Sequence, residues 1–372
     1  MKPIPITFVI NDFSGAGAQK LIVGILAHID RTRFRPVLIT LFEPKTSAMM
    51  YHLIPNDVEV VRLSFRNARD IRSWLGLYRA LKRVRPNVVV SQLFFSNTAC
   101  RILKPFLGYA AIATEQNTYT NKSRFHQYID RALSHVSYAI VAVSTTVKTF
   151  TAKQEGIAPS KFRVIYNATD TKEVEATVKK YNREEIKKEL DLAHARIMIN
   201  AARLSEQKNH MLLLRGFARV AHENEDLHLV ILGEGEKRGE LESEARLLSI
   251  DHRVHFLGYR DDVYRYYAGS DFFISTSRIE GLSLAYIEAL SAGLPILSTQ
   301  TSGTDEMVEE GVNGFFIREH TPEAVAEGLN RMLTANPRTL SDAARISARR
   351  FDIVETTRQY ENLMLEAIAQ RS

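Results

Sequence analysis

The regular alternation of short apolar runs with amphipathic stretches is the feature that most constrains this fold. Thirteen runs read as strands, at residues 6–10, 36–41, 58–63, 87–91, 111–114, 139–143, 163–166, 197–202, 229–232, 254–257, 272–275, 295–298 and 314–317. Helical patterns separate them; between residues 71 and 81 apolar side chains recur on one helix face, and Pro86 ends that pattern. The alternation predicts an α/β protein with parallel sheets covered by helices on both faces.

The chain is long enough for two such domains, because it has 372 residues and a domain typically has roughly 100–200. A strand ends near Asn167, the highly charged segment 179–191 follows, and the order of strand, polar loop and helix then starts again. We expect two doubly wound, Rossmann-like domains over residues 1–167 and 168–350, with a C-terminal helix in residues 351–372 packing back on the first. Such sheets bind ligands at the carboxyl ends of their strands, so we expect the domains to face each other across a cleft.

Targeting and cysteine patterns favour a cytoplasmic protein. The first ten residues do not resemble a signal peptide. The longest apolar stretch, residues 282–297, is too short to span a bilayer and is interrupted by Glu288, Gly293 and Pro295. Cys100 is the single cysteine, so no internal disulfide can form, which fits a reducing compartment.

Charge is distributed unevenly along the chain. Residues 1–165 contain 23 Lys and Arg against 9 Asp and Glu, a net charge of +14, so the remainder is at −8 within the total of +6. Cations gather in residues 66–85, and in residues 119–131 they alternate with aromatic side chains. Such an imbalance indicates an anionic partner, and we favour an anionic membrane surface over nucleic acid. The alternative is an ordinary solvated helix face.

The most informative segment follows the predicted strand at residues 272–275. Gly281 allows a tight turn, and Ser283 is placed to cap a helix over residues 284–292. Glu288 is the only charged residue in the stretch 282–297, and a buried carboxylate is costly unless a partner such as a ribose hydroxyl binds it. Glu280 stands on the loop, beside helix N–H groups that attract anions. The alternative is that Glu288 pairs with a basic neighbour and that Glu280 is a surface residue.

A second polar loop follows the strand at residues 197–202. It carries Arg203 and Lys208 just before a helix, where two cations and the helix dipole would suit a diphosphate. On its own this pattern is weak, because cations in a loop are usually solvated. No Asp-x-Asp sequence occurs in the chain, so we see no motif for a metal ion and expect none.

One pattern resembles the signature of glycosyltransferase family 4, whose members are retaining enzymes of the GT-B fold. It consists of Glu280 and Glu288, separated by seven residues, and the sequence Ala-Leu-Ser-Ala-Gly-Leu-Pro that follows. The resemblance extends over most of the chain and is strongest from residue 200 to residue 314. It implies that Glu280 contacts hydroxyls of the transferred sugar and that Glu288 binds the ribose of the nucleotide. Arg203 and Lys208 would then hold the donor phosphates and stabilise the leaving group.

The resemblance also implies roles for residues whose own patterns are less specific. On the donor side these are Gly15, Gly17, Gly233, Gly235, Tyr259, Gly281, Leu282, Ser283 and Leu284. Gly15 and Gly17 belong to a loop similar to the family's Gly-Gly-Ala-Glu loop, here with Ala16 and Gln19 in place of Gly and Glu. On the acceptor side we select Glu115, Gln116 and Asn117. Many family members have His where Gln116 stands, and an amide cannot carry a proton. For Glu115 a surface carboxylate is the equal alternative.

These expectations combine into a metal-independent, retaining hexosyltransferase without a cofactor. Its donor would be a nucleotide diphosphate sugar, with UDP as the default nucleotide, and its acceptor a cell-surface glycan or a lipid-linked sugar. Two other functions stay open: a sugar-nucleotide epimerase of the same fold, and a basic protein that binds nucleic acid or membranes. A catalytically inactive scaffold is disfavoured, because Arg203, Lys208, Glu280 and Glu288 are all present.

Overall fold

The computed structural model describes residues 2–14, 17–43, 50–67, 70–120 and 122–370. The chain divides into two compact units, one formed by residues 1–169 together with 353–372, the other by residues 170–352. A strand is present at each of the thirteen predicted positions, within a few residues of the predicted bounds. The predicted fold class, two Rossmann-like parallel-sheet domains, is therefore confirmed.

The sheet of the first unit has seven parallel strands in the order β3-β2-β1-β4-β5-β6-β7. The strands are β1 (Ile4–Ile10), β2 (Phe34–Thr40), β3 (Glu59–Arg62), β4 (Val88–Gln92), β5 (Ala110–Glu115), β6 (Ala139–Ala142) and β7 (Phe162–Val164). In the register, Phe8 of β1 lies beside Leu38 of β2 on one side and Val90 of β4 on the other. The direction of strand addition reverses between β1 and β4, which makes their carboxyl ends the switch point of this sheet.

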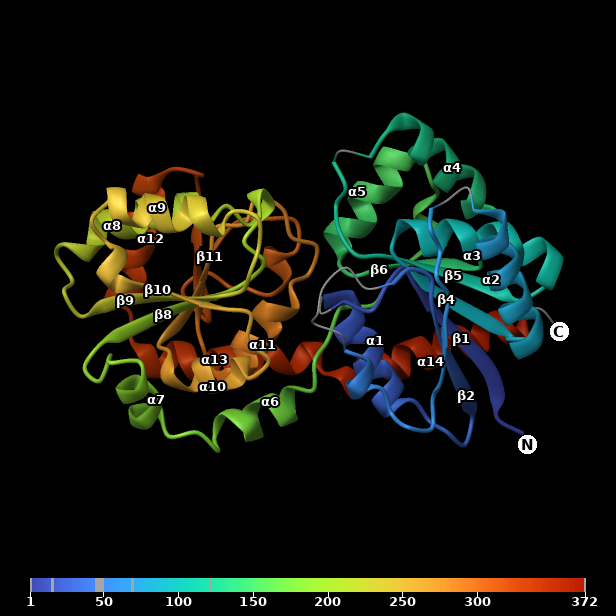
Figure 1. The fold of residues 1–372 in the computed structure, drawn as a ribbon, viewed down its shortest axis with the longest axis horizontal. Coiled ribbons are helices and arrows are strands. Elements are labelled where there is room, and N and C mark those ends of the chain that lie inside the picture. Colours follow the sequence, from blue (N-terminus) through green and yellow to red (C-terminus); the bar gives the residue numbers. More distant parts are fainter. Residues whose placement is uncertain (1, 15–16, 44–49, 68–69, 121, 371–372) are drawn as a thin grey trace. The chain divides into compact units, whose positions relative to one another are not determined.

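This reversal distributes the helices of the first unit over the two faces of its sheet (Figure 1). Right-handed crossovers place helices on opposite faces when strands are added in opposite directions. One face carries α1 (Gly17–His28) and α14 (Ile353–Ala369), which share a core with β1 and β4. The other face carries α2 (Ile71–Val84), α3 (Phe94–Leu107), α4 (Arg124–Ser134) and α5 (Thr145–Glu155). Short 3-10 helices lie at Tyr51–Leu53 and Pro159–Lys161.

The second unit repeats the plan with six parallel strands in the order β10-β9-β8-β11-β12-β13. They are β8 (Arg196–Ala201), β9 (Leu227–Leu232), β10 (Val254–Gly258), β11 (Phe272–Ser275), β12 (Ile296–Thr299) and β13 (Gly314–Ile317). The helices are α6 (Thr171–Val178), α7 (Arg183–Glu189), α8 (His210–Ala221), α9 (Arg238–Leu247), α10 (Val263–Gly269), α11 (Leu284–Ala292), α12 (Pro322–Thr334) and α13 (Pro337–Ala348). One-turn 3-10 helices lie at Glu206–Lys208, Asp251–Arg253, Thr304–Glu306 and Arg349–Phe351. Here the strand order reverses between β8 and β11.

Helix ends follow the sequence signals in most places. Asp70 caps α2 by accepting a hydrogen bond from the backbone N–H of Arg72, and Gly293 ends α11 in the left-handed conformation with φ 84°. The predicted cap of α11 is wrong, because Ser283 occupies the N-cap position but its side chain makes no capping hydrogen bond. No helix in the described part of the chain is long and apolar enough to cross a membrane.

Candidate active site

The switch point of the second sheet joins the two loops that carry the predicted donor residues. β8 and β11 are neighbours, so the loop after β8 (residues 202–209) lies beside the loop after β11 (residues 276–283). Gln207 fastens the loops: its side-chain Nε2 donates to the carbonyl of Ile279 at 2.8 Å, and its carbonyl accepts from the N–H of Arg278 at 2.9 Å. Residues more than 70 positions apart in sequence thereby share one site.

Lys208 and Glu280 form an ion pair at this switch point. Lys208 Nζ donates to Glu280 Oε1 at 2.6 Å, and only 21% of the lysine side chain and 8% of the glutamate side chain are exposed. The alternative of Glu280 as a surface carboxylate is therefore wrong. The pair offers a cation to a phosphate and a carboxylate to sugar hydroxyls within one small volume.

The N-terminus of α11 lies next in the chain after Glu280. The first N–H groups of a helix have no intrahelical partner, and the Ser283 side chain does not cap them. Leu282 and Leu284 are 3% and 7% exposed, so their side chains face the protein interior and a ligand could reach only their backbone. The helix therefore presents backbone donors and the positive end of its dipole to an anion.

Glu288 lies one turn further along α11, about 6 Å from Leu284 along the helix axis. It is 3% exposed, as the apolar surroundings predict. Its charge acts on Tyr267 of α10: burial first, and the charge of Glu288 second, raise the pKa of Tyr267 well above its ordinary value. Glu288 is thus a buried carboxylate on the helix that opens at the switch point.

Two other predicted donor residues, Arg203 and Tyr259, are much more exposed than Lys208 and Glu280. The Arg203 side chain is 74% exposed, and its guanidinium lies 3.5 Å from Glu236 Oε2. Tyr259, directly after β10, is 53% exposed. The structure therefore brings Lys208 and Glu280 together, whereas Arg203 pairs with a different carboxylate.

Gly233 and Gly235 have a structural role that the sequence did not reveal. A Cβ atom at Gly233 would lie 2.0 Å from the carbonyl oxygen of Ala202, and one at Gly235 would lie 2.2 Å from that of Leu204. The turn after β9 is therefore pressed against the backbone of the loop that carries Arg203. Gly303, after β12, is a further glycine that sequence reasoning missed, since a Cβ there would lie 1.6 Å from the carbonyl oxygen of Gly281.

Asn200 and His210 form a second missed feature, which anchors the loop of Arg203 and Lys208. Asn200 Nδ2 donates to the carbonyl of Ile274 at 2.7 Å, and its Oδ1 lies 2.8 Å from His210 Nε2. Burial lowers the pKa of His210 to about 4, so the ring is neutral at pH 7 and donates from Nε2. The chain of contacts ties β8, β11 and the start of α8 together, and a polar residue inside a buried strand is the signal that could have found it.

At the switch point of the first sheet, neutral side chains predominate. Asn11 Oδ1 accepts from Ser96 N at 2.9 Å, which joins the end of β1 to the first turn of α3, the helix that follows β4. Gln116 Nε2 donates to Gln92 Oε1, and Gln116 Oε1 accepts from Asn167 Nδ2, both at 3.2 Å. The amide of Gln116, which stands where the family resemblance would place His, is thereby oriented on both sides.

The other predicted residues of the first unit that the structure describes lie close to this edge of the sheet. Gly17 begins α1, and Gly15 lies outside the described residues. Gln19 is 3% exposed, and its Nε2 donates to the carbonyl of Asp12 at 3.1 Å, so it holds the loop together. Asn117 Oδ1 accepts from the N–H of Thr118 at 2.8 Å.

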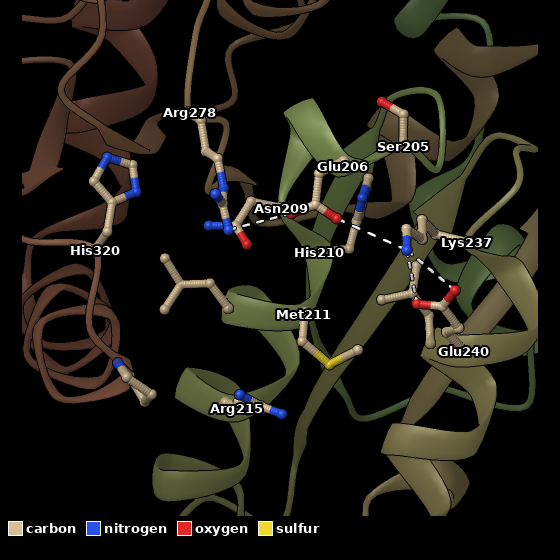
Figure 2. A pocket seen from close by; sticks show the side chains of 13 residues that line it. Ser205, Glu206, Asn209, His210, Met211, Arg215, Lys237, Glu240, Arg278 and His320 are labelled. Atoms are coloured by element: carbon tan, nitrogen blue, oxygen red, sulfur yellow. Dashed lines mark hydrogen bonds and ion pairs between the residues drawn. The ribbon is translucent and has the colours of Figure 1, made fainter.

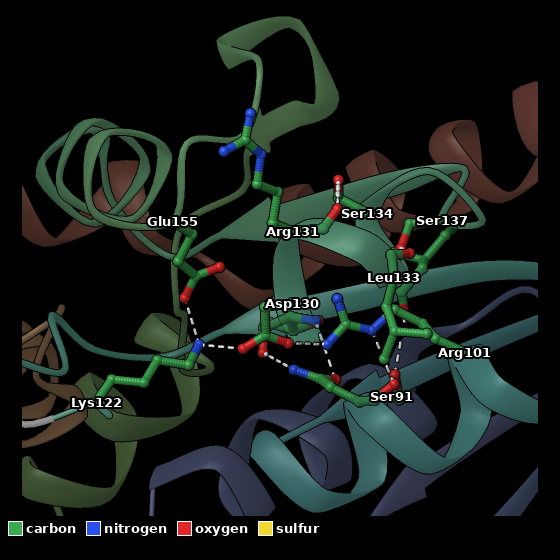
Figure 3. Close-up of polar contacts among 12 residues, drawn as sticks. Ser91, Arg101, Lys122, Asp130, Arg131, Leu133, Ser134, Ser137 and Glu155 are labelled. Carbon is green, nitrogen blue, oxygen red and sulfur yellow. Dashed lines mark hydrogen bonds and ion pairs between the residues drawn. The ribbon is translucent and has the colours of Figure 1, made fainter. Parts of the chain in front are cut away.

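Glu115 belongs to a buried group of charged residues: it is only 6% exposed, and the charges of Lys122, Asp130 and Arg101 act on it. Lys122 bridges Asp130 and Glu155, and Arg101 pairs with Asp130 (Figure 3). Burial, as the largest cause, raises the pKa of Glu115, and the charge of Lys122 opposes this. The surface-loop alternative for Glu115 is wrong, because the group joins β5, α3, α4 and α5 inside the unit.

The second unit also contains a pocket of about 540 Å³, shown in Figure 2. Its walls include the first residues of α8 together with Lys237, Arg278 and His320. None of the predicted donor residues lines it. Glu206 on its rim is shared by Arg278 at 3.3 Å and Lys237 at 3.8 Å, so the acid offsets part of the pocket's positive charge.

Solved structures and curated proteins resemble this chain over different lengths. The Anabaena protein Alr3699/HepE, solved in complex with UDP-glucose, superposes with a TM-score of 0.84 over 99% of this chain and 100% of that one at 19% identity, which establishes the shared fold. An N-acetylgalactosaminyltransferase of Campylobacter jejuni, named for a diphospho-undecaprenol acceptor, is 30% identical over 54% of this chain and 53% of its own length. An Escherichia coli UDP-Gal:α-D-GlcNAc-diphosphoundecaprenol α-1,3-galactosyltransferase is 23% identical over 71% and 70%. The chain spans about half the length of the first curated relatives that it matches.

Two family models divide the chain between them. The model described as Glycosyltransferase Family 4 matches residues 15–173, and the one described as Glycosyl transferases group 1 matches residues 182–350. The first covers the unit with Gln116, and the second covers the unit with the Lys208–Glu280 pair. With both halves matched and the GT-B architecture in place, the chain belongs to the family 4, group 1 glycosyltransferases.

Proposed function

We propose that this protein transfers a sugar from a nucleotide diphosphate sugar, with UDP as the nucleotide, onto a lipid-linked or glycan acceptor. The observation that carries the proposal is the Lys208–Glu280 ion pair at the switch point beside the uncapped N-terminus of α11. This arrangement combines a cation and backbone donors for a diphosphate with a carboxylate for sugar hydroxyls.

Donor binding would redistribute the interactions of this pair. The diphosphate would take Lys208 Nζ and the first N–H groups of α11, and Glu280 would accept hydrogen bonds from the sugar. Glu288 would meet the ribose, and the exposed Arg203 would swing from Glu236 to the phosphates. Positive charge held where the leaving diphosphate gains negative charge lowers the barrier to its departure.

We further propose that the reaction retains the configuration of the anomeric carbon and needs no metal ion. The departing phosphate oxygen would take the proton of the acceptor hydroxyl as the new glycosidic bond forms on the same face. Within the described residues, no three His, Cys, Asp or Glu side chains are grouped as metal ligands, and Lys208 with the α11 dipole would supply the charge.

For the acceptor, we propose that the first unit binds it at the edge that carries Gln116 and Asn117. Two relatives are named for acceptors on an undecaprenyl diphosphate, which supports a lipid-linked sugar. Such an acceptor would place the protein at the cytoplasmic surface of a membrane as a peripheral protein.

Purified protein incubated with UDP-sugars, alone and with an undecaprenyl-diphosphate-linked sugar, tests the proposal. We expect a glycosylated lipid only when donor and acceptor are both present, and stabilisation against heat by UDP.

Glu280→Gln should lower kcat by roughly 100-fold while UDP still stabilises the protein, because the diphosphate contacts remain. Glu225→Gln, at an exposed carboxylate just before β9, is the matched control and should keep kcat within about twofold.

The same assay addresses the alternative of an epimerase of the same fold. A new sugar nucleotide formed without acceptor would favour epimerisation and contradict transfer. No stabilisation by any nucleotide diphosphate would contradict both activities.

A further inference from the structure

The outer face of α2, α3, α4 and α5 has an unusual charge composition. These helices, all of whose residues the structure describes, contain ten Lys and Arg and only two acids, Asp130 and Glu155. The acids and Arg101 are buried, with side chains 1–2% exposed, and they take part in the internal ion pairs. These helices therefore contribute nine cations and no carboxylate to the surface; one of the nine, Arg83, pairs with Glu59 of β3.

Large apolar side chains stand among these cations at the N-terminal ends of the helices. On α4, Phe125 and Tyr128 are 70% and 68% exposed; on α2, Ile71 and Leu75 are 73% and 45% exposed. Phe125 and Tyr128 are three residues apart and so lie on one side of α4, next to the exposed Arg124 and Arg131. The first turns of α3 and α4 are in contact, with the rings of Phe94 and His126 4.6 Å apart.

An ordinary solvated helix does not combine these features. α9 of the second unit, for comparison, mixes both signs, and its Arg238 pairs with Glu234 and Glu242. Aromatic side chains flanked only by cations suit the interface of an anionic bilayer, where rings enter the headgroup layer and cations meet lipid phosphates. A nucleic-acid surface would need the cations but would not need protruding aliphatic side chains such as Ile71.

We propose that the outer face of α2–α5 is a docking surface for an anionic lipid bilayer, with Phe125 and Tyr128 as its anchors. The inference deepens the proposed function, on which its biological meaning rests, by naming the surface that would approach the membrane. α4 follows β5 through the loop that contains Gln116, Asn117 and the 40% exposed Tyr119. A docked α4 therefore brings the edge proposed for the acceptor close to the lipid that would carry it (Figure 1).

Co-sedimentation of the full chain with vesicles tests the surface. We use phosphatidylcholine vesicles with and without phosphatidylglycerol, and expect binding only to the anionic vesicles, weakened by salt. Phe125→Ser with Tyr128→Ser, and separately Arg124→Gln with Arg131→Gln, should each weaken binding by about tenfold. The controls are Leu247→Ser, at an 80% exposed side chain of the second unit, and Arg246→Gln with Arg338→Gln; both should bind like the wild type.

Each other outcome overturns the proposal. Equal binding to both vesicle types, no binding to either, or equal losses in the control variants would do so. Retention by an RNA duplex in place of vesicles would assign the face to nucleic acid. Stabilisation by UDP, measured on the same variants, separates the two proposals. If the protein does not bind vesicles but UDP still stabilises it, the docking surface alone is contradicted. If it binds vesicles but UDP does not stabilise it, the proposed function alone is contradicted.

Discussion

The two sheets end in switch points of the same topology but of opposite chemistry. In the second unit the edge between β8 and β11 holds a charged pair, Lys208 and Glu280, beside an uncapped helix N-terminus. In the first unit the corresponding edge holds amides, with Gln116 between Gln92 and Asn167. Asp12 is half-buried there, and the side chains of Lys122, Asp130 and Glu155 are packed inside. A diphosphate needs positive charge, whereas sugar hydroxyls can be bound by neutral amides as well as by carboxylates. Our proposal therefore assigns the donor to the charged edge and the acceptor to the neutral edge.

Removing the cation of the charged edge should have the largest effect. Lys208→Met takes away the proposed phosphate contact and leaves Glu280 buried without its ion-pair partner, so we expect kcat/KM to fall by roughly 10²- to 10³-fold. Steady-state kinetics, with a melting curve to verify folding, measure this. Arg278→Met is the matched control, because Arg278 lies on the paired loop and contacts Glu206. A similar loss in both variants would contradict a specific role for Lys208.

A change at the neutral edge should be smaller and should affect a different parameter. Gln116→Leu removes a hydrogen-bonding amide from the proposed acceptor side, so we expect the acceptor KM to rise about tenfold. Stabilisation of the protein by UDP should not change. Gln359→Leu on α14 serves as control, since Gln359 makes a local hydrogen bond to Glu355 on its own helix. If UDP binding weakened along with acceptor binding, the assignment of one edge to each substrate would be wrong.

The smallest expected effect is on the pH dependence of stability. Rising pH should destabilise the first unit through Glu155, whereas falling pH should destabilise the second unit through His210. Burial, followed by the charge of Glu115, raises the pKa of Glu155 to about 7 from 4.5, so the stabilising protonated form is lost as pH rises from about 4.5 through 7. Burial lowers the pKa of His210 to about 4 from 6.5, so its contribution is lost as pH falls from 6.5 through 4.

Melting temperatures of Glu155→Gln and the wild type between pH 5 and pH 8 compare these contributions. As pH rises over this range, we expect the melting temperature of Glu155→Gln to increase by a few degrees relative to that of the wild type. For His210→Gln, the melting temperature should instead increase relative to that of the wild type as pH falls. A constant difference between Glu155→Gln and the wild type at every pH would show that Glu155 stays ionised in the folded protein.

The fold was predictable because burial of parallel strands on both faces leaves a mark in the sequence. Most strands are apolar runs long enough to recognise, although the edge strand β3 has a charged residue at each end, and Pro86 and Gly293 mark helix ends. Prediction failed at caps and loops, where a single hydrogen bond decides the outcome: Ser283 has the residue type of a cap but does not act as one. Glu115 looked like a possible surface carboxylate because the cations whose charges act on it, Arg101 and Lys122, come from other elements of the unit.

The amino-acid order was enough to establish two α/β halves, a basic first half, and carboxylates and cations in loops after strands, since these depend on local periodicity and on counting charges. Tertiary structure decided which of those residues meet. The loops of Lys208 and Glu280 meet because β8 and β11, distant in sequence, become neighbours where the order of the sheet reverses. Within the loop after β8, Lys208 pairs with Glu280 and Arg203 with Glu236. Gly233 and Gly303 are required for the same reason: each lies against the backbone of a loop from another strand, a contact that no local pattern encodes.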